Sequence, residues 1–123
     1  MRLLAALRRR LAAAPARVGA TEAAALVRQG ALLLDVREPA EWAAGHAPQA
    51  RHIPLGQLAG RLAELPADRP VVTVCRSGAR SARAAALLAR QGRPASNLAG
   101  GMHAWAAAGL PVVDGRGRAG RVA

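Results

Sequence analysis

Four strand-like segments alternate with segments of helical spacing along the chain. Residues 31–36 (ALLLDV) and 71–74 (VVTV) are apolar at mostly consecutive positions, which is typical of strands covered on both faces. Residues 51–55 (RHIPL) contain a proline and predict a minor or edge strand, and residues 95–98 (ASNL) predict a last short strand. The pattern indicates a sheet that is buried between other elements.

Helical signals fill the stretches between these strands. Thr21 is placed to cap a helix that runs to about Arg28. Pro39 and Gly45 suit the start and end of a helix of one or two turns. Three more helices are predicted. One is indicated by leucines at helical spacing, and two by glycines at their ends; these residues are Leu55, Leu58, Leu62, Leu65, Gly92 and Gly109. Alternating strands and helices predict an α/β domain with right-handed crossovers and a mostly parallel sheet.

The two buried strands lead into side chains that can do chemistry. Asp35 lies at the end of the first strand, and Cys75 directly follows the second. Because ligand sites of parallel sheets lie at the carboxyl ends of the strands, both residues are candidates for one site. A lone cysteine in this position is by itself more often a buried apolar residue than a nucleophile. The residues that follow Cys75 decide between these interpretations.

A short basic loop, Arg76-Ser77-Gly78-Ala79-Arg80, separates Cys75 from a helix. The N–H groups of a tight strand-to-helix loop can converge on an anion, helped by the helix dipole. Such a place lowers a thiol pKa from about 8.5 to about 7 or below. We therefore interpret Cys75 as a candidate nucleophile.

The side chains of the loop have different expected tasks. Arg76 is placed to meet an incoming anion, and Arg80 to hold the loop or the substrate by a forked hydrogen-bond pair. Both could instead be surface arginines of a cationic protein. Ser77 and Ser81 offer hydroxyls to a thiolate or to the helix end, and capping is the preferred interpretation for Ser81.

Composition narrows the classes of partner and cofactor. The chain has 123 residues, which fits one domain, and a net charge of +11 in which every basic residue is arginine. This charge favours anions, but nucleic acid is not expected because no binding motif is present and aromatic residues are almost absent. One cysteine excludes an internal disulfide and, with three histidines in no ligand pattern, indicates no metal and no cofactor. A reducing, cytoplasmic location is expected.

The two ends differ from the middle of the chain. Residues 1–17 predict a basic helical extension whose arginines interrupt the apolar stretch needed for a signal or a membrane span, although an interfacial or transit-type role stays open. Residues 114–123 predict a flexible basic tail, since few apolar side chains are available to attach it. Residues 18–113 form the expected domain. Trp42 and Trp105 are expected in its core.

The length of the basic loop favours sulfur over phosphorus chemistry. Four residues separate Cys75 from Arg80, one fewer than in the loop of cysteine phosphatases, so the ring is tighter. Residues 69–92 contain no carboxylate to protonate an alkoxide leaving group. Sulfite, which leaves when thiosulfate is cleaved, needs no such acid.

Four signatures in order make the chain resemble the single-domain rhodaneses, which are thiosulfate-type sulfurtransferases. They are LLLDVREPAEWAAGH (32–46), HIPL (52–55), VVTVCRSGARSARAAALL (71–88) and NLAGGMHAWAAAGLPV (97–112). The chain departs from the family's pattern after Gly45-His46, where Ala47 and Gln49 replace an apolar residue and a glycine. This departure concerns the geometry of a turn and leaves the nucleophile unaffected.

The resemblance implies a rhodanese-like fold: a five-stranded, mostly parallel sheet with helices on both faces. It implies that Cys75 carries a persulfide, cradled by residues 76–80, and that sulfur moves by double displacement. The donor would be a small anion such as thiosulfate, and the acceptor a thiol, cyanide or a protein. Asp35 would support the loop or an arginine, or would pair only with Arg37. The alternative function is a noncatalytic, partner-binding or regulatory module of the same fold.

Overall fold

The structure is a computed structural model that describes residues 15–123. The strands are β1 (Ala16–Val18), β2 (Leu32–Asp35), β3 (Arg51–His52), β4 (Val71–Val74) and β5 (Ala95–Leu98). The helices are α2 (Ala20–Arg28), α3 (Pro39–Ala44), α4 (Leu55–Leu58), the 3-10 helix η1 (Ala59–Glu64), α5 (Ala79–Arg90) and α6 (Gly101–Ala107). Most of the predicted N-terminal helix lies outside the described residues.

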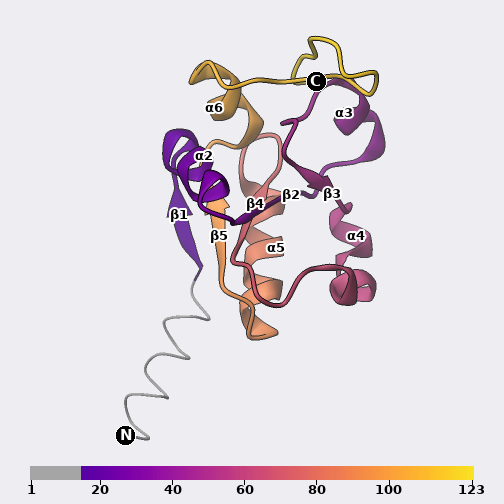
Figure 1. Ribbon diagram of the computed structural model, residues 1–123. Helices are drawn as coiled ribbons and strands as arrows, with labels where there is room; N and C mark the ends of the chain where they lie inside the picture. The colour runs from indigo at the N-terminus through magenta and orange to yellow at the C-terminus, as the bar shows by residue number, and fades with distance from the viewer. Residues whose placement is uncertain (1–14) are drawn as a thin grey trace, which may run out of the picture.

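The strands form one parallel sheet in the order β1-β5-β4-β2-β3 (Figure 1). Because every pair is parallel, all five carboxyl ends point to the same edge of the sheet. Central strands β2 and β4 pair with Asp35 opposite Val74, so Asp35 lies one register position from Cys75. The predicted α/β fold with five parallel strands is confirmed.

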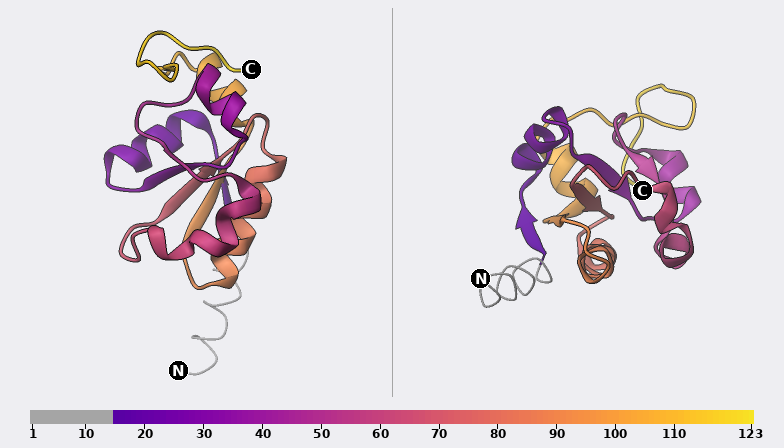
Figure 2. Two further views of the ribbon diagram at one scale, coloured as in Figure 1. Left: turned by 90° about the vertical axis from the view of Figure 1, so that its right-hand side faces the viewer. Right: turned by 60° about the horizontal axis from the view of Figure 1, so that its bottom comes forward.

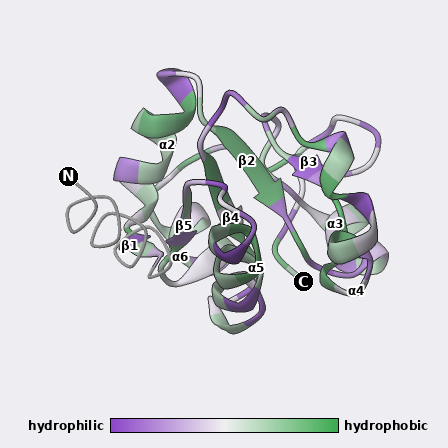
Figure 3. Ribbon diagram, turned by 90° about the horizontal axis from the view of Figure 1, so that it is seen from below, coloured by the Kyte–Doolittle hydropathy of each residue, from purple (hydrophilic) through white to green (hydrophobic). Residues whose placement is uncertain are grey.

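Two apolar cores lie on opposite faces of the sheet. Leu33 and Val72 pack with α2 and α6, whereas their neighbours Leu34 and Val71 pack with α4 and α5. Side chains of a strand point alternately to its two faces, and here both faces are covered, which explains the continuous apolar runs. Figure 2 shows α2 on one side of the sheet and α4 and α5 on the other, and in Figure 3 β2 is hydrophobic along most of its length.

Several predicted details of the N-terminal and leucine-rich segments are wrong. Strand β1 was not predicted, and it includes Ala16 and Arg17, which the sequence placed in the extension. Its short sequence, ARV, has two exposed residues and so lacks an apolar run. Thr21 lies inside α2, whose N-cap is Gly19. The helix expected from the leucine spacing is divided into α4 and η1, with non-helical backbone angles at Arg61.

The two tryptophans have different environments. Trp105 is fully buried, and its indole N–H donates to the Pro111 carbonyl oxygen at 2.8 Å. Trp42 is only half-buried, so its predicted core position is wrong. Its ring is stacked between His46, at 3.6 Å between centroids, and His52, at 4.8 Å. The aromatic residue in α3 thus packs on polar rings at the edge of the domain.

Residues 114–123 form an attached hairpin instead of the expected flexible tail. Val113 forms β-bridges with His46 and Ala119, and the Arg121 N–H donates to the Ala44 carbonyl oxygen at the end of α3 at 3.0 Å. Figure 1 shows this yellow segment beside α3. Backbone hydrogen bonds attach this segment, and Val122 also packs against the apolar core that includes Trp105.

Candidate functional site

Cys75 follows β4 directly and faces the α5 side of the sheet. Its carbonyl oxygen accepts from the Met102 N–H at the start of α6 at 2.8 Å. Its sulfur accepts from the Gly78 N–H at 3.1 Å and from the Ser81 hydroxyl at 3.2 Å. Gly78 is the N-cap of α5 and has φ +123°, a value that L side chains rarely adopt, so glycine allows its N–H to turn back toward the sulfur.

The surroundings of the thiol act on its pKa in opposite directions. Burial raises the pKa of Cys75, because a charged sulfur loses solvent. Hydrogen bonds from the Ser81 hydroxyl and from the N–H groups of Ser81, Gly78 and Ser77 lower it, and the net pKa lies below the ordinary thiol value. The residue is only 1% exposed. The structure therefore places a buried sulfur, whose thiolate form is favoured by hydrogen bonds, at the bottom of the loop.

The exposed residues of the loop line its outer rim. Arg76, Ser77 and Ala79 are exposed, and Gly78 is half-buried. The Arg76 Nε donates to the Ala123 carbonyl oxygen at 2.8 Å, so the hairpin at residues 114–123 reaches the rim. The Arg76 carbonyl oxygen in turn accepts from the His103 N–H at 3.2 Å. These contacts leave the Arg76 guanidinium at the surface, where the sequence placed it.

Arg80 is held by a carboxylate that the sequence did not single out. Its two terminal nitrogens donate to the two oxygens of Glu41 in α3 at 2.6 and 2.8 Å. The hydrogen bond from Arg80 holds the pKa of Glu41 down at about 2, and the same contact raises the pKa of Arg80. The predicted forked pair is present, but its partner is α3 rather than the loop or a substrate.

Of the two roles considered for Asp35, support of the loop or pairing only with Arg37, the structure shows the pairing with Arg37. Within residues 15–123, the hydrogen bonds that its carboxylate accepts all come from Arg37, through the backbone N–H at 3.0 Å, Nε at 3.0 Å and Nη2 at 2.7 Å. Both side chains are completely buried, and Arg37 Nη2 also donates to the Gly45 carbonyl oxygen at 2.7 Å. Asp35 thus fixes the segment between β2 and α3, and it supports the site only through that segment.

The sequence indicated that Ser81 caps α5, and this prediction is wrong. Ser81 is buried in the first turn of that helix. Its hydroxyl lies 3.2 Å from the Cys75 sulfur, 3.2 Å from the Gly78 carbonyl oxygen and 2.6 Å from Oδ1 of Asn97 in β5. Asn97 is 6% exposed, and its Nδ2 donates to the Gly78 carbonyl oxygen at 3.2 Å. Sequence reasoning missed Asn97, because only its place in the NLAGG signature marked it.

Gly101, the second glycine of the NLAGG signature, lies where the backbone of the loop leaves no room for a side chain. It has φ +57°, and a Cβ added there would collide with the carbonyl oxygens of Cys75 and Arg76. A side chain at this position would push α6 away from the loop. The start of α6 can therefore donate its N–H groups to the loop only because this residue is glycine.

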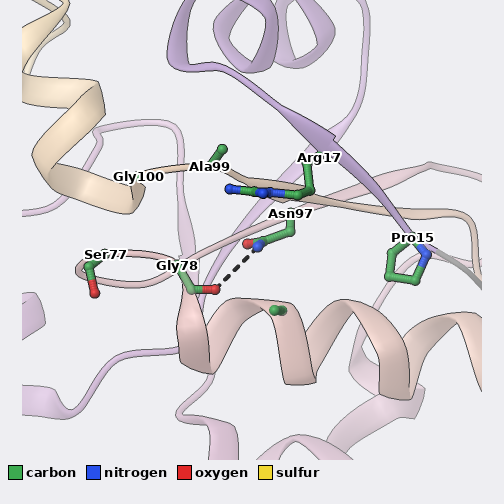
Figure 4. A pocket seen from close by; sticks show the side chains of 8 residues that line it. Pro15, Arg17, Ser77, Gly78, Asn97, Ala99 and Gly100 are labelled. Atoms are coloured by element: carbon green, nitrogen blue, oxygen red, sulfur yellow. Dashed lines mark hydrogen bonds between the residues drawn. The ribbon is translucent and has the colours of Figure 1, made fainter.

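A pocket of about 410 Å³ lies on the β5 side of the loop (Figure 4). Figure 4 shows the Arg17 side chain from β1 beside Asn97, with Ser77 and Gly78 on the other side. Its lining residues are Pro15, Arg17, Ser77, Gly78, Ala82, Asn97, Ala99 and Gly100. One guanidinium and few polar groups give this pocket a cationic, otherwise small-residue surface.

Residues 15–123 contain no group of three or more histidine, cysteine, aspartate or glutamate side chains that could hold a metal ion. In the same part of the chain, no helix has both the length and the apolar character required to cross a membrane.

The chain is similar to known proteins in both sequence and fold. The Rhodanese-like domain profile matches residues 19–108, which is most of the chain. The chain belongs to the rhodanese-like domain family. It is 49% identical over 87 residues to a protein named sulfurtransferase from Allochromatium vinosum, covering 70% of this chain and 81% of that protein. It is 37% identical over 90 residues to thiosulfate sulfurtransferase GlpE of Pseudomonas syringae, covering 72% and 85%.

Solved rhodanese structures agree with the fold. A rhodanese-related protein from Thermoplasma volcanium superposes with a TM-score of 0.75 at 30% identity, covering 80% of this chain and 97% of that one. Together with the relatives named sulfurtransferase, this rhodanese domain supports a sulfurtransferase-like function.

Proposed function

We propose that the protein transfers sulfane sulfur from thiosulfate, or a similar small anion, to a thiophilic acceptor through a persulfide on Cys75. The supporting observation is the pair of donors, the Gly78 N–H and the Ser81 hydroxyl, that contact the Cys75 sulfur at the start of α5. Donors of this kind favour a thiolate, which is the nucleophilic form of cysteine. The GlpE relative, named for thiosulfate, supports the choice of donor.

In the first half-reaction, the Cys75 thiolate attacks the outer sulfur of thiosulfate. A bond forms between the two sulfurs, the S–S bond of thiosulfate breaks, and its electron pair leaves with sulfite. The loop N–H groups, of which those of Ser77 and Gly78 already act on the Cys75 sulfur, would hold the transferred sulfur, and the Arg76 guanidinium would attract the anion at the rim. Ser81 supports the ring from α5, and Asp35 supports it by fixing Arg37 and the start of α3.

In the second half-reaction, an acceptor attacks the outer sulfur of the persulfide. The S–S bond breaks, and its electron pair returns to Cys75 as a thiolate, which completes a double displacement. Thiols, cyanide and protein persulfide acceptors all fit this step. We place the enzyme in a reducing compartment, the cytoplasm, because the cycle requires Cys75 to stay reduced.

The charge state of Glu41 argues against phosphate ester chemistry at this site. Its carboxylate approaches the loop through Arg80, and its pKa of about 2 leaves it ionised at neutral pH. An ionised carboxylate cannot protonate an alkoxide leaving group. Sulfite leaves without a proton, so the same arrangement suits thiosulfate.

Intact mass spectrometry tests the proposal. The full chain is incubated with thiosulfate, weighed, treated with cyanide and weighed again. We expect a gain of one sulfur atom that cyanide removes, and no gain for Cys75→Ser. A wild-type mass that never changes with thiosulfate would overturn the proposal.

The 1% exposure of Cys75 favours a second candidate, a noncatalytic module that binds a partner with the same fold. That candidate predicts no sulfur loading from any small donor, and partner binding that is unaffected by Cys75→Ser. The mass measurement therefore separates the two candidates.

A further inference from the structure

The Ser81 hydroxyl has one proton and three acceptors within reach. These acceptors are the Cys75 sulfur at 3.2 Å, the Gly78 carbonyl oxygen at 3.2 Å and Asn97 Oδ1 at 2.6 Å. A hydroxyl donates one hydrogen bond at a time, so the acceptors compete. The distances favour Asn97 when the sulfur is neutral, whereas a charged sulfur would attract the proton more strongly.

The orientation of Asn97 is fixed by its second contact. The Gly78 carbonyl oxygen is an acceptor only, so the amide nitrogen of Asn97 faces it at 3.2 Å (Figure 4). The amide oxygen is therefore turned toward Ser81. Asn97 is 6% exposed and lies on β5, next to the strand that leads to Cys75. Rotating its amide would place two carbonyl oxygens against each other, at Asn97 and Gly78.

We propose that Asn97 is a positioning residue that competes with Cys75 for the hydrogen bond donated by the Ser81 hydroxyl. Asn97 accepts this hydrogen bond when the enzyme carries sulfur. In the resting thiolate the negative charge is on the Cys75 sulfur, and Ser81 donates to it. In the persulfide the charge is on the outer sulfur, so the Cys75 sulfur becomes a weak acceptor and Ser81 donates to Asn97. The persulfide half of this inference rests on the proposed function, and the thiolate half does not.

Other charged and titratable groups around the thiol come from each neighbouring element. They are Arg80 in α5 with its partner Glu41 in α3, Arg76 in the loop, the Asp35–Arg37 pair after β2, and His103 in α6. None of these groups is changed in the variants below. A change in the thiol titration then reports the Ser81 and Asn97 contacts.

The first test titrates the Cys75 thiolate by its ultraviolet absorbance. Asn97→Ala removes the competing acceptor, so its midpoint lies below that of wild type. Ser81→Ala removes the donor, so its midpoint lies above wild type. Adding Asn97→Ala to Ser81→Ala then has no further effect, because Asn97 acts through Ser81. Asn97→Asp provides a stronger acceptor but also a negative charge, so only the part of its rise in midpoint that requires Ser81 reports the hydrogen bond. Ser96→Ala, on the opposite face of β5, is the matched control and leaves the midpoint unchanged.

An unchanged or raised midpoint in Asn97→Ala overturns the inference, and so does a lowered midpoint that persists without Ser81. If Asn97→Ala fails to fold, Asn97→Asp is compared with and without Ser81→Ala, and a rise in the midpoint that is equal in both backgrounds overturns the inference. Thermal melting of each variant shows whether the fold is kept.

The second test measures the equilibrium between thiolate and persulfide. Each protein is loaded with thiosulfate and titrated with sulfite, which reverses the loading. We expect Asn97→Ala to hold sulfur roughly fivefold less well than wild type, because the persulfide loses one hydrogen bond. Equal loading equilibria overturn the persulfide half. A wild type that never loads contradicts the proposed function instead, while the midpoint order still tests the competition for the proton.

Discussion

Replacing Glu41 by glutamine removes the carboxylate that binds Arg80 and leaves the shape of the side chain intact. The pKa of Glu41 falls from 4.5 to about 2 through its contact with Arg80. At about 1.4 kcal/mol for each unit, this fall corresponds to at most about 3 kcal/mol of stability. The side chains are 21% and 32% exposed, so solvent screening reduces the expected effect on the free energy of unfolding to about 1–2 kcal/mol.

The pH dependence of this stabilisation has a definite sign. The folded-state pKa of Glu41 lies below its unfolded-state value, so the stabilisation is complete above the ordinary pKa of 4.5. It is lost as the pH falls through about 2, where the folded-state carboxylate also takes up a proton. The difference between wild type and Glu41→Gln should therefore be present at pH 7 and nearly absent at pH 2.

Urea unfolding at a series of pH values measures this difference. Glu64→Gln is the matched control, because Glu64 pairs with Arg61 on the surface, where the side chains are 52% and 36% exposed. Such an exposed pair contributes little, so the control should unfold almost as wild type does. An equal difference at pH 7 and pH 2, or an equal loss in Glu64→Gln, would show that the Glu41–Arg80 pair does not stabilise the fold in this way.

Two substitutions test the packing around the loop. Gly101→Ala should lower the free energy of unfolding by roughly 3 kcal/mol, because it combines positive φ with a collision against the loop, and urea unfolding measures this loss. Gly109→Ala, with φ +75° and open space around its Cβ, controls for the backbone term and should cost only about 1–2 kcal/mol; equal losses would contradict the collision. Trp105→Ala should lower the melting temperature strongly, with a loss of about 3–5 kcal/mol, because this fully buried side chain joins α6 to its core; a loss below 1 kcal/mol would contradict that burial.

The sequence predicted the central part of the fold because its strongest signals are local. Strands β2 and β4 are buried on both faces, so their apolar runs were visible without any partner. Cys75 and its loop were recognisable because the change from apolar to basic residues occurs within the loop itself. Edge strand β1 gave no such signal, since two of its three residues are exposed.

The contacts that complete the site join residues far apart in the chain. Arg80 and Glu41 are 39 positions apart, and Ser81 and Asn97 are 16 apart. Such pairs are set by the strand order and the helix packing, which a single sequence does not specify. The hairpin at residues 114–123 was missed for a related reason, because it is attached by backbone groups that every residue has and by a single valine, Val122, that packs against the core.

Hydrogen bonds from the Gly78 N–H and the Ser81 hydroxyl hold the pKa of the Cys75 thiol below its ordinary value and so favour the thiolate. Thiolate absorbance as a function of pH measures this directly, because the chain has one cysteine and no tyrosine to interfere. We expect a midpoint below about 8.5, the value of an ordinary cysteine, in the folded chain and a return toward that value in urea. A folded-state midpoint at or above the ordinary value would contradict it.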